Sequence, residues 1–162
     1  MSVRDAGPAD FPAILALNQA DVAALSPLDL DSLAALHAQA ASHRAAQVDG
    51  AVVAFQLALR EGAAYPSLNY RWFCERYDRF LYVDRVVVHA GHRQAGLASL
   101  LHADLVALAR ASGVPAITCE YDLVPPNLAS ARFHARHGFA EVGMQTLPGG
   151  KQVSLQEKRL SP

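Results

Sequence analysis

Residues 86–99 read VVVHAGHRQAGLAS, and this stretch decides the fold. Three valines end an apolar strand, a short turn follows, and the spaced leucines after Gly96 predict a helix. The first turn of a helix presents backbone N–H groups without intrahelical partners, together with the positive end of the helix dipole. Gly96 permits close approach of a ligand, and Arg93 adds a fixed positive charge. On physical grounds this turn suits a phosphate group, with an ordinary capped helix as the alternative.

The turn is neither of the two best-known nucleotide loops. The chain contains no GxxxxGK[ST] sequence and no GxGxxG sequence. A nucleotide hydrolase is therefore a weak interpretation.

The composition indicates one soluble globular domain, which we expect to span residues 1–162. Hydrophobic residues make up 52% of the chain and charged residues 18%, a balance that argues against disorder. Lys and Arg number 14 and Asp and Glu 15, so the formal net charge is −1. A near-neutral chain has no electrostatic footprint for nucleic acid or an anionic membrane, so we expect neither partner.

Several kinds of segment and site are missing from the sequence. Cys74 and Cys119 form no CxxC pair, and the N-terminus lacks the basic and apolar blocks of a signal peptide. No window has 18 uncharged apolar residues, and no Cys/His cluster has metal-ligand spacing. We therefore predict a cytoplasmic protein without a metal. His37 and His43 are expected at the surface.

Strands and helices interleave in the middle of the chain, while the first and last strand pairs read as antiparallel, which predicts a mixed α+β class. Asp49-Gly50 is a strong hairpin signal. One face of the first helix collects the apolar residues Phe11, Ile14, Leu15, Val22 and Leu25. The predicted strands are 2–5, 44–49, 51–60, 79–89, 116–123, 140–147 and 152–160. The predicted helices begin at Pro8, after a cap at Asp29 or Asp31, at Gly96 and at Leu128, and 63–78 is expected to be irregular.

Two short motifs resemble those of the GNAT superfamily of N-acetyltransferases. Residues 93–98, RQAGLA, match the R/Q-x-x-G-x-G/A signature of the turn that binds the pyrophosphate of acetyl-coenzyme A. Residues 127–139, NLASARFHARHGF, resemble the second signature, N-x-x-(A/S)-x-x-(F/L)-Y-x-x-x-G-F. The order of elements agrees from residue 2 to residue 160. The resemblance implies a mostly antiparallel twisted sheet with one parallel, splayed strand pair and helices on both faces.

The resemblance also implies how acetyl-coenzyme A (acetyl-CoA), the expected cosubstrate, is held. The coenzyme would lie where the strands around Val86 and Glu120 splay apart. Backbone groups of the first strand would pair with the pantetheine arm, and the amides of the turn would hold the pyrophosphate. The coenzyme-binding residues expected in this way are Val86, Val87, Val88, Arg93, Gln94, Ala95, Gly96, Leu97, Ala98, Ser99, Asn127 and Phe133.

The implied reaction is direct transfer of an acetyl group to a primary amine of a small molecule or a peptide N-terminus. Glu120 is the first choice for the base that removes the proton of the amine, with Asp84 and Tyr82 as rivals. A lone acid on a strand also serves often as an ion-pair partner, for which Arg85 or Arg132 is available. Where the family has a tyrosine that protonates the departing thiolate, this chain has His134, which can hold a proton near neutral pH or simply pack.

The acceptor amine would enter on the side opposite the coenzyme, which the resemblance assigns partly to the segment before the central strand. Four aromatic residues of that segment are expected to line the acceptor site or to form a local mini-core: Tyr70, Trp72, Phe73 and Tyr77. Many relatives pair through the late hairpin, so a homodimer is an expected assembly. The missing tyrosine motivates a second hypothesis, a non-catalytic acyl-CoA-binding or interaction module on the same fold.

Overall fold

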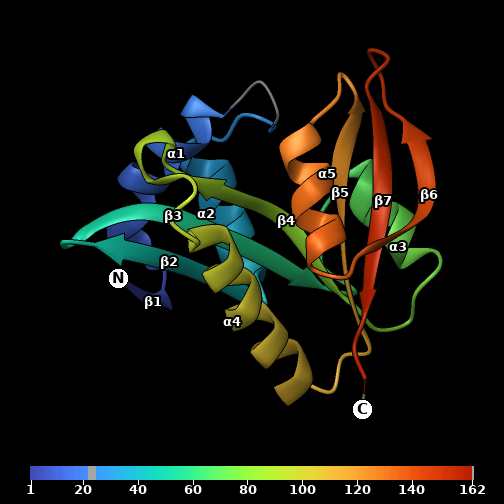
Figure 1. Cartoon of the computed structure of the whole chain (residues 1–162), viewed down its shortest axis with the longest axis horizontal. Helices are drawn as coiled ribbons and strands as arrows, with labels where there is room; N and C mark the ends of the chain where they lie inside the picture. Colours follow the sequence, from blue (N-terminus) through green and yellow to red (C-terminus); the bar gives the residue numbers. More distant parts are fainter. Residues whose placement is uncertain (22–24, 162) are drawn as a thin grey trace. The chain divides into compact units, whose positions relative to one another are not determined.

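The computed structural model describes residues 1–21 and 25–161, so the predicted face residue Val22 lies outside the described residues. The chain divides into two compact units, Met1–Leu59 with Val83–Leu108 (unit 1) and Arg60–Tyr82 with Ala109–Pro162 (unit 2). The helices and strands are β1 (Ser2–Asp5), α1 (Phe11–Ala20), α2 (Leu30–Gln39), β2 (Ser42–Val48), β3 (Ala51–Arg60), α3 (Leu68–Cys74), β4 (Leu81–Val88), α4 (Leu97–Ala111), β5 (Ala116–Val124), α5 (Leu128–Arg136), β6 (Ala140–Thr146) and β7 (Gln152–Arg159), with 3-10 turns at Pro8–Asp10 and Ala90–His92 (Figure 1).

The strands form a mixed sheet in the order β1-β2-β3-β4-β5-β7-β6. The β1–β2, β2–β3, β5–β7 and β6–β7 pairs are antiparallel. The β4–β5 pair is parallel, and its register places Leu81 opposite Ile117 and Tyr82 opposite Thr118. The predicted class, a mostly antiparallel α+β sheet with one parallel pair, is confirmed.

The hairpin between β2 and β3 turns at the predicted dipeptide. Asp49 and Gly50 both have positive φ, 51° and 80°. Two successive residues of this kind match the right-handed twist of a two-residue hairpin, and Asp and Gly tolerate the conformation better than other residues.

Helices cover both faces of the sheet in unit 1, as predicted (Figure 1). Alternation along a strand sends neighbouring side chains to opposite faces. Ala45 of β2 therefore belongs to a cluster with Phe11 and Ile14 of α1, whereas Ala46 belongs to a cluster with α4 residues. The cap of α2 is Asp29, whose Oδ1 accepts a hydrogen bond from the N–H of Ser32 at 2.8 Å.

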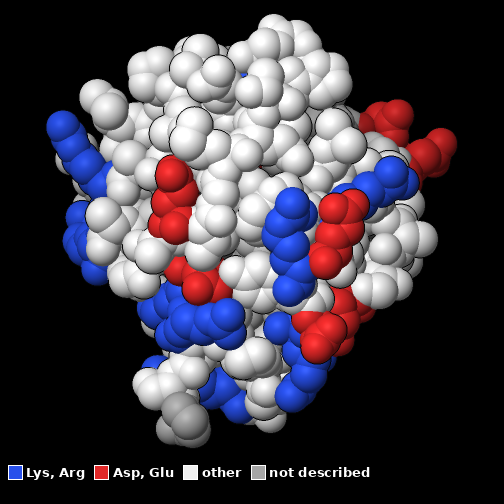
Figure 2. All heavy atoms as spheres, turned by 90° about the vertical axis from the view of Figure 1, so that its right-hand side faces the viewer, with Lys and Arg blue, Asp and Glu red and all other residues white. Residues whose placement is uncertain are grey.

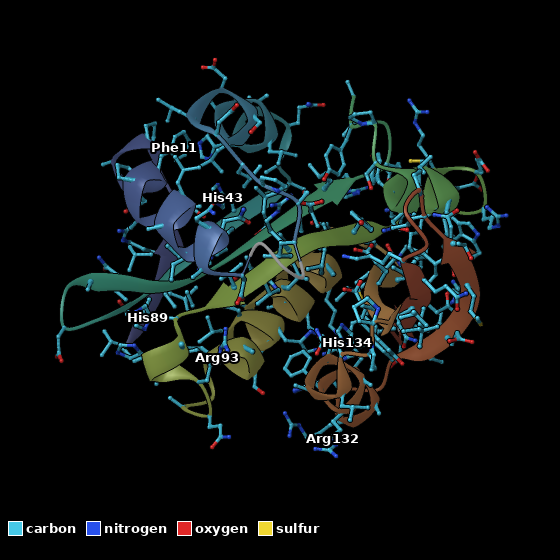
Figure 3. All side chains as sticks on the ribbon, turned by 90° about the horizontal axis from the view of Figure 1, so that it is seen from above. Phe11, His43, His89, Arg93, Arg132 and His134 are labelled. Carbon is cyan, nitrogen blue, oxygen red and sulfur yellow. The ribbon has the colours of Figure 1, made fainter. Side chains whose placement is uncertain are left out.

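His43 does not lie at the surface, and that prediction is wrong. Only 6% of the residue is exposed, and its ring packs between Phe11 and Phe55 (Figure 3). Its Nδ1 lies 2.8 Å from Nδ1 of His37, a distance at which one of the two nitrogens must carry the shared proton. Apolar surroundings favour the neutral ring, so burial lowers the pKa of His43 to about 4.

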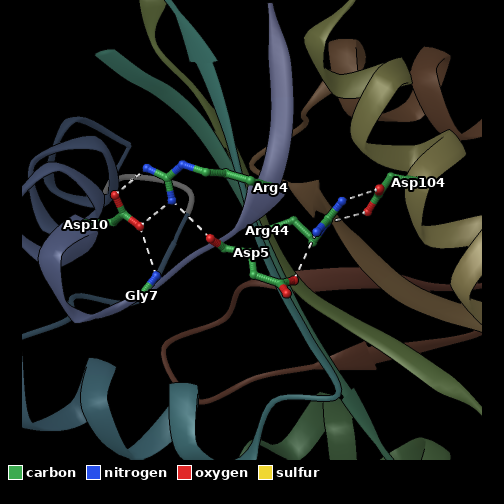
Figure 4. Close-up of polar contacts among 6 residues, drawn as sticks. All are labelled: Arg4, Asp5, Gly7, Asp10, Arg44 and Asp104. Carbon is green, nitrogen blue, oxygen red and sulfur yellow. Dashed lines mark hydrogen bonds and ion pairs between the residues drawn. The ribbon is translucent and has the colours of Figure 1, made fainter. Parts of the chain in front are cut away.

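Two bidentate ion pairs join elements of unit 1, one between residues six positions apart and one between residues 60 positions apart (Figure 4). Arg4 of β1 donates to both carboxylate oxygens of Asp10, at 2.7 and 2.8 Å. The guanidinium lowers the pKa of Asp10 to about 2, because hydrogen bonding favours the charged carboxylate. Arg44 of β2 donates in the same way to Asp104 of α4, at 2.9 and 3.0 Å.

Residues 68–74 form the helix α3, where an irregular segment was predicted, and that prediction is wrong. Ser67 caps the helix by accepting a hydrogen bond from the N–H of Tyr70 at 3.3 Å. Tyr70 and Phe73, three residues apart and so on one helix face, are 1% and 0% exposed. Tertiary packing of that face stabilises a helix too short to form in isolation.

Acidic and basic side chains lie side by side on the face drawn in Figure 2. Such an arrangement agrees with the net charge of −1. In the described part of the chain, no helix is long and apolar enough to cross a bilayer.

Candidate active site

The turn after β4 is held in place by its own backbone and by His89. The N–H of His89 donates to the carbonyl of Val53 in β3 at 2.8 Å, which fixes the end of the strand. The Nδ1 of His89 accepts a hydrogen bond from the N–H of Gly91 at 3.0 Å. These two hydrogen bonds fix the backbone at the point where the chain leaves the sheet.

The next residues adopt a backbone conformation that is rare outside glycine. Gln94 has φ 66° and Gly96 has φ 80°, and residues 93–96 are exposed. A non-glycine residue in the left-handed region costs energy and is found preferentially at ligand sites. Alternating backbone handedness at a turn points successive N–H groups to one side, which creates a concave anion site.

Helix α4 begins directly after this turn. Its first intrahelical hydrogen bond runs from the N–H of Leu100 to the carbonyl of Gly96, at 2.9 Å. The amides of the helix's first turn therefore precede its hydrogen-bond ladder and add the positive end of the dipole. The turn and the helix start have the features of an anion site, and binding of a coenzyme pyrophosphate there stays a prediction.

Arg93 belongs to this turn (Figure 3) and also lines an apolar hollow. Its Nη2 pairs with Oδ1 of Asp21 at 2.9 Å, and its side chain is 54% exposed. The hollow has a volume of about 460 Å³, with small residues of α1 on one wall and Val52 and Val88 on another. The cation of the turn thus has a carboxylate partner within unit 1.

Glu120 and Tyr82, two candidates for the base, meet in one hydrogen bond within unit 2. The parallel β4–β5 register brings them together, and the Tyr82 hydroxyl donates to Oε1 of Glu120 at 2.5 Å. Tyr82 is 1% exposed, whereas Glu120 is half-buried. A phenol that donates to a carboxylate orients it, so the carboxylate of Glu120 is the proton acceptor of the pair.

Asp84, the third candidate, is an ion-pair partner in unit 1. Its Oδ2 accepts from Nε of Arg85 at 2.6 Å, and both side chains are almost fully buried. Arg85 also donates to Oδ1 of Asn18 at 2.8 Å and to the carbonyl and hydroxyl of Ser26 at 3.1 Å. The ion-pair interpretation of Asp84, with Arg85 as its partner, is confirmed.

Helix α5 positions His134. Asn127 caps the helix as predicted, its Oδ1 accepting from the N–H of Ser130 at 3.1 Å. Nδ1 of His134 lies 2.6 Å from the carbonyl oxygen of Ser130. Burial lowers the pKa of His134 below its usual value, an effect that the Ser130 carbonyl opposes in part. Beside this imidazole lies Tyr121 of β5, with 5.3 Å between the ring centroids.

A sequence model of the acetyltransferase (GNAT) family matches residues 15–139. The chain belongs to this family. It is an acetyltransferase. Comparison with curated protein sequences finds no significant match.

Solved structures agree with this acetyltransferase in fold. Ard1 from Thermoplasma volcanium has a TM-score of 0.81 at 15% identity, covering 99% of this chain and 98% of its own. Ribosomal-protein-alanine N-acetyltransferase from Brucella melitensis has a TM-score of 0.75 at 23% identity, and the match covers 99% of this chain and 100% of that protein. YncA of Salmonella typhimurium, a putative acetyltransferase solved with its cofactor acetyl-CoA, has a TM-score of 0.76 at 21% identity. The match covers 100% of this chain and 95% of YncA.

The aromatic segment of the acetyltransferase is a packed cluster in unit 2. The buried Tyr70 donates from its hydroxyl to the carbonyl of Arg60 at 2.5 Å, and Phe73 packs against Tyr82. Trp72 is half-buried and lies under the guanidinium of Arg76, 4.0 Å from the ring centroid. The cluster has the packing of a mini-core, with Trp72 as its partly exposed member.

Tyr77 is half-buried at the side of the same cluster. Its hydroxyl donates to Oε2 of Glu157 in β7 at 2.6 Å. Burial, together with the bond to this carboxylate, raises the pKa of Tyr77. Among residues 1–21 and 25–161, no group of three or more His, Cys, Asp or Glu side chains has a metal-binding arrangement.

Sequence reasoning did not single out Tyr121, whose ring lies against the ring of His134. The available signal was its place directly after Glu120 on a strand, since a side chain next to a candidate base faces the other side of the sheet. The partnership of Tyr121 with His134 depends on how α5 packs on β5, which no local pattern contains.

Proposed function

We propose that this acetyltransferase transfers the acetyl group of acetyl-CoA to a primary amine by direct attack. The observation that carries the proposal is the left-handed backbone of Gln94 and Gly96 at the start of α4. This turn offers N–H groups and a helix dipole to a pyrophosphate without needing a basic surface. The acetyl-CoA in the related YncA structure supports the same cosubstrate here.

The coenzyme would use backbone more than side chains. The amides of Gln94 to Ser99 would hold the pyrophosphate, and the backbone of Val86–Val88 would pair with the pantetheine arm as an added strand. Arg93 would exchange the carboxylate of Asp21 for a phosphate oxygen. Asn127, the cap of α5, and Phe133 within that helix are further residues proposed to contact the coenzyme.

Glu120 would act as the base. A primary amine is mostly protonated at neutral pH and must lose a proton before its nitrogen can attack. The carboxylate of Glu120, oriented by the Tyr82 hydroxyl, accepts that proton directly or through a water. The nitrogen then forms a bond to the acetyl carbon and loses its second proton, and the carbon–sulfur bond breaks to release the coenzyme thiolate.

The acceptor is proposed to be a small-molecule amine or a peptide N-terminus. The Brucella relative is named for acetylation of a ribosomal-protein alanine, which makes a peptide with a free N-terminal alanine a suitable first substrate. Trp72 and Tyr77, both half-buried, would contact the acceptor, and the buried Tyr70 and Phe73 would support them from beneath.

A non-catalytic acyl-CoA-binding module is the second candidate, favoured by the tie between His134 and Ser130 at the place of the family's tyrosine. Titration calorimetry with acetyl-CoA tests what both candidates share, since no binding at high micromolar concentration would contradict both. Turnover against a panel of amines and peptide N-termini separates them. Glu120→Gln should lower kcat by about 100-fold or more, while Glu75→Gln, at an exposed glutamate of unit 2, should retain it.

A further inference from the structure

Consecutive residues of β5 place two proton-transfer groups on opposite sides of the sheet. Side chains alternate along a strand, so Glu120 and Tyr121 face opposite ways. Glu120 meets Tyr82 on the side of α3, because Tyr82 packs against Tyr70 and Phe73. Tyr121 meets His134 of α5, with 5.3 Å between ring centroids and an interplanar angle of 33°.

His134 itself is poorly suited to donate a proton. A carbonyl oxygen can only accept a hydrogen bond, so Nδ1 carries the proton in its 2.6 Å contact with Ser130. Burial lowers the pKa of His134 and so favours the neutral ring, although the hydrogen bond to Ser130 acts in the opposite direction. In a neutral imidazole with a proton on Nδ1, the Nε2 atom has a lone pair and accepts.

Tyr121 has the chemistry that His134 lacks. A phenol holds its proton at neutral pH and donates it readily to a strongly basic atom. Tyr121 is half-buried on β5, where its backbone pairs with Ser154 of β7, so its position is set by the sheet. Its ring contacts the imidazole at the helix position where the family's second signature has a tyrosine.

We propose that Tyr121 is the catalytic residue that protonates the departing thiolate, and that His134 is a positioning residue whose ring holds the phenol in place. The inference rests on the proposed acetyl transfer. The base and the acid of the reaction would then be neighbours in sequence on opposite faces of one strand.

The proton balance is complete with these two groups. The ammonium gives its first proton to the carboxylate of Glu120, which passes it to solvent, and the nitrogen gives a second proton to Glu120 as the nitrogen–carbon bond forms. The carbon–sulfur bond breaks, its electron pair stays on sulfur, and the thiolate takes the hydroxyl proton of Tyr121. The tyrosinate and the protonated Glu120 then exchange with solvent, so both return to their starting states.

The test compares Tyr121→Phe with the wild type in the full chain, using acetyl-CoA and the most reactive amine of the panel. General acid catalysis contributes about 100-fold to 10,000-fold in rate, so kcat should fall by about 100-fold or more while KM for acetyl-CoA changes by less than about threefold. The alkaline limb of the kcat profile, which reports a group that must be protonated, should disappear. Tyr65→Phe, the removal of a hydroxyl elsewhere in unit 2, should leave kcat unchanged.

A second measurement does not depend on the acceptor. The thiol of bound coenzyme A should ionise at a higher pH in Tyr121→Phe than in the wild type, as followed by the ultraviolet absorbance of the thiolate. Circular dichroism and calorimetry with acetyl-CoA establish that the variant is folded. His134→Ala should lower kcat, and His134→Phe should restore most of it, because an aromatic ring again contacts Tyr121.

Two results would overturn the inference while leaving the acetyltransferase reaction intact. One is a Tyr121→Phe enzyme with wild-type kcat and an unchanged thiol ionisation. The other is a fall of kcat by about 100-fold or more in His134→Phe, the loss expected when the proton donor is removed. That result would make His134 the acid. A wild-type protein that binds no acetyl-CoA would instead overturn the proposed function, and the inference with it.

Discussion

Replacing His43 by leucine should remove an acid sensitivity of unit 1. The imidazole is packed between Phe11 and Phe55, and its Nε2 has no hydrogen-bond partner in the described part of the chain. Its pKa is lowered to about 4 by burial and by His37, against about 6.5 in an unfolded chain. Protonation therefore favours unfolding.

The sign and size follow from that difference. A lowered histidine pKa means that the unfolded state binds more protons, so stability falls as the pH falls from about 6.5 towards about 4. Each pH unit within this window is worth about 1.36 kcal/mol, so the folded state should lose about 2 kcal/mol between pH 7 and pH 5 through this group. Asp10, with a pKa of about 2, loses its contribution only below the usual aspartate range.

Urea unfolding followed by far-ultraviolet circular dichroism at pH 7 and pH 5 measures the effect. The free energy of unfolding of the wild type should fall by about 2 kcal/mol more than that of His43→Leu. Equal losses in the two proteins would refute the reasoning, because they would mean that His43 titrates alike in the folded and unfolded chains.

Three further substitutions have defined outcomes. Gly96→Ala should lower the free energy of unfolding by about 1–2 kcal/mol, the cost of a left-handed alanine, since no atom lies within 4 Å of the added methyl. The same backbone strain in the proposed phosphate turn should weaken acetyl-CoA binding in calorimetry. Gly143→Ala would place a carbon 2.5 Å from the Trp72 ring and should cost about 1–3 kcal/mol in denaturant unfolding, an effect that Trp72→Ala should largely suppress. Arg85→Met should cost about 3–5 kcal/mol by removing the ion-pair partner of the buried Asp84 carboxylate, and adding Asp84→Asn should recover part of it.

The sequence alone predicted the elements whose signals are local. Ala51–Arg60 begins at a hairpin dipeptide and alternates regularly, and the structure has the strand with those bounds. Asn127 was recognised as a cap, and Asp29 as one of two candidates beside Asp31, because a cap needs only the next three residues. The turn at 93–98 could be predicted for the same reason, because its motif consists of consecutive residues. A single domain over residues 1–162 stays a prediction.

What the sequence could not supply depends on partners distant in the chain. Helix α3 forms because Tyr70 and Phe73 are buried against other parts of unit 2. The helix is too short to show a repeating pattern of apolar residues in the sequence. His43 looks polar in sequence, yet α1 and β3 enclose it. The bond between Tyr82 and Glu120 joins residues 38 positions apart, so the sequence could not show that these two candidate bases share a hydrogen bond.

The division of unit 1 between two stretches of chain has a consequence for synthesis on the ribosome. When residue 59 has been made, α1, α2 and the first strands exist, but Val87, Leu97 and Leu101 of the same two apolar clusters do not. At about 5–20 residues per second, the roughly 50 residues up to the end of the second stretch take roughly 2–10 s to add. During that interval the nascent N-terminal third exposes apolar surface, which makes it a natural client for a ribosome-associated chaperone.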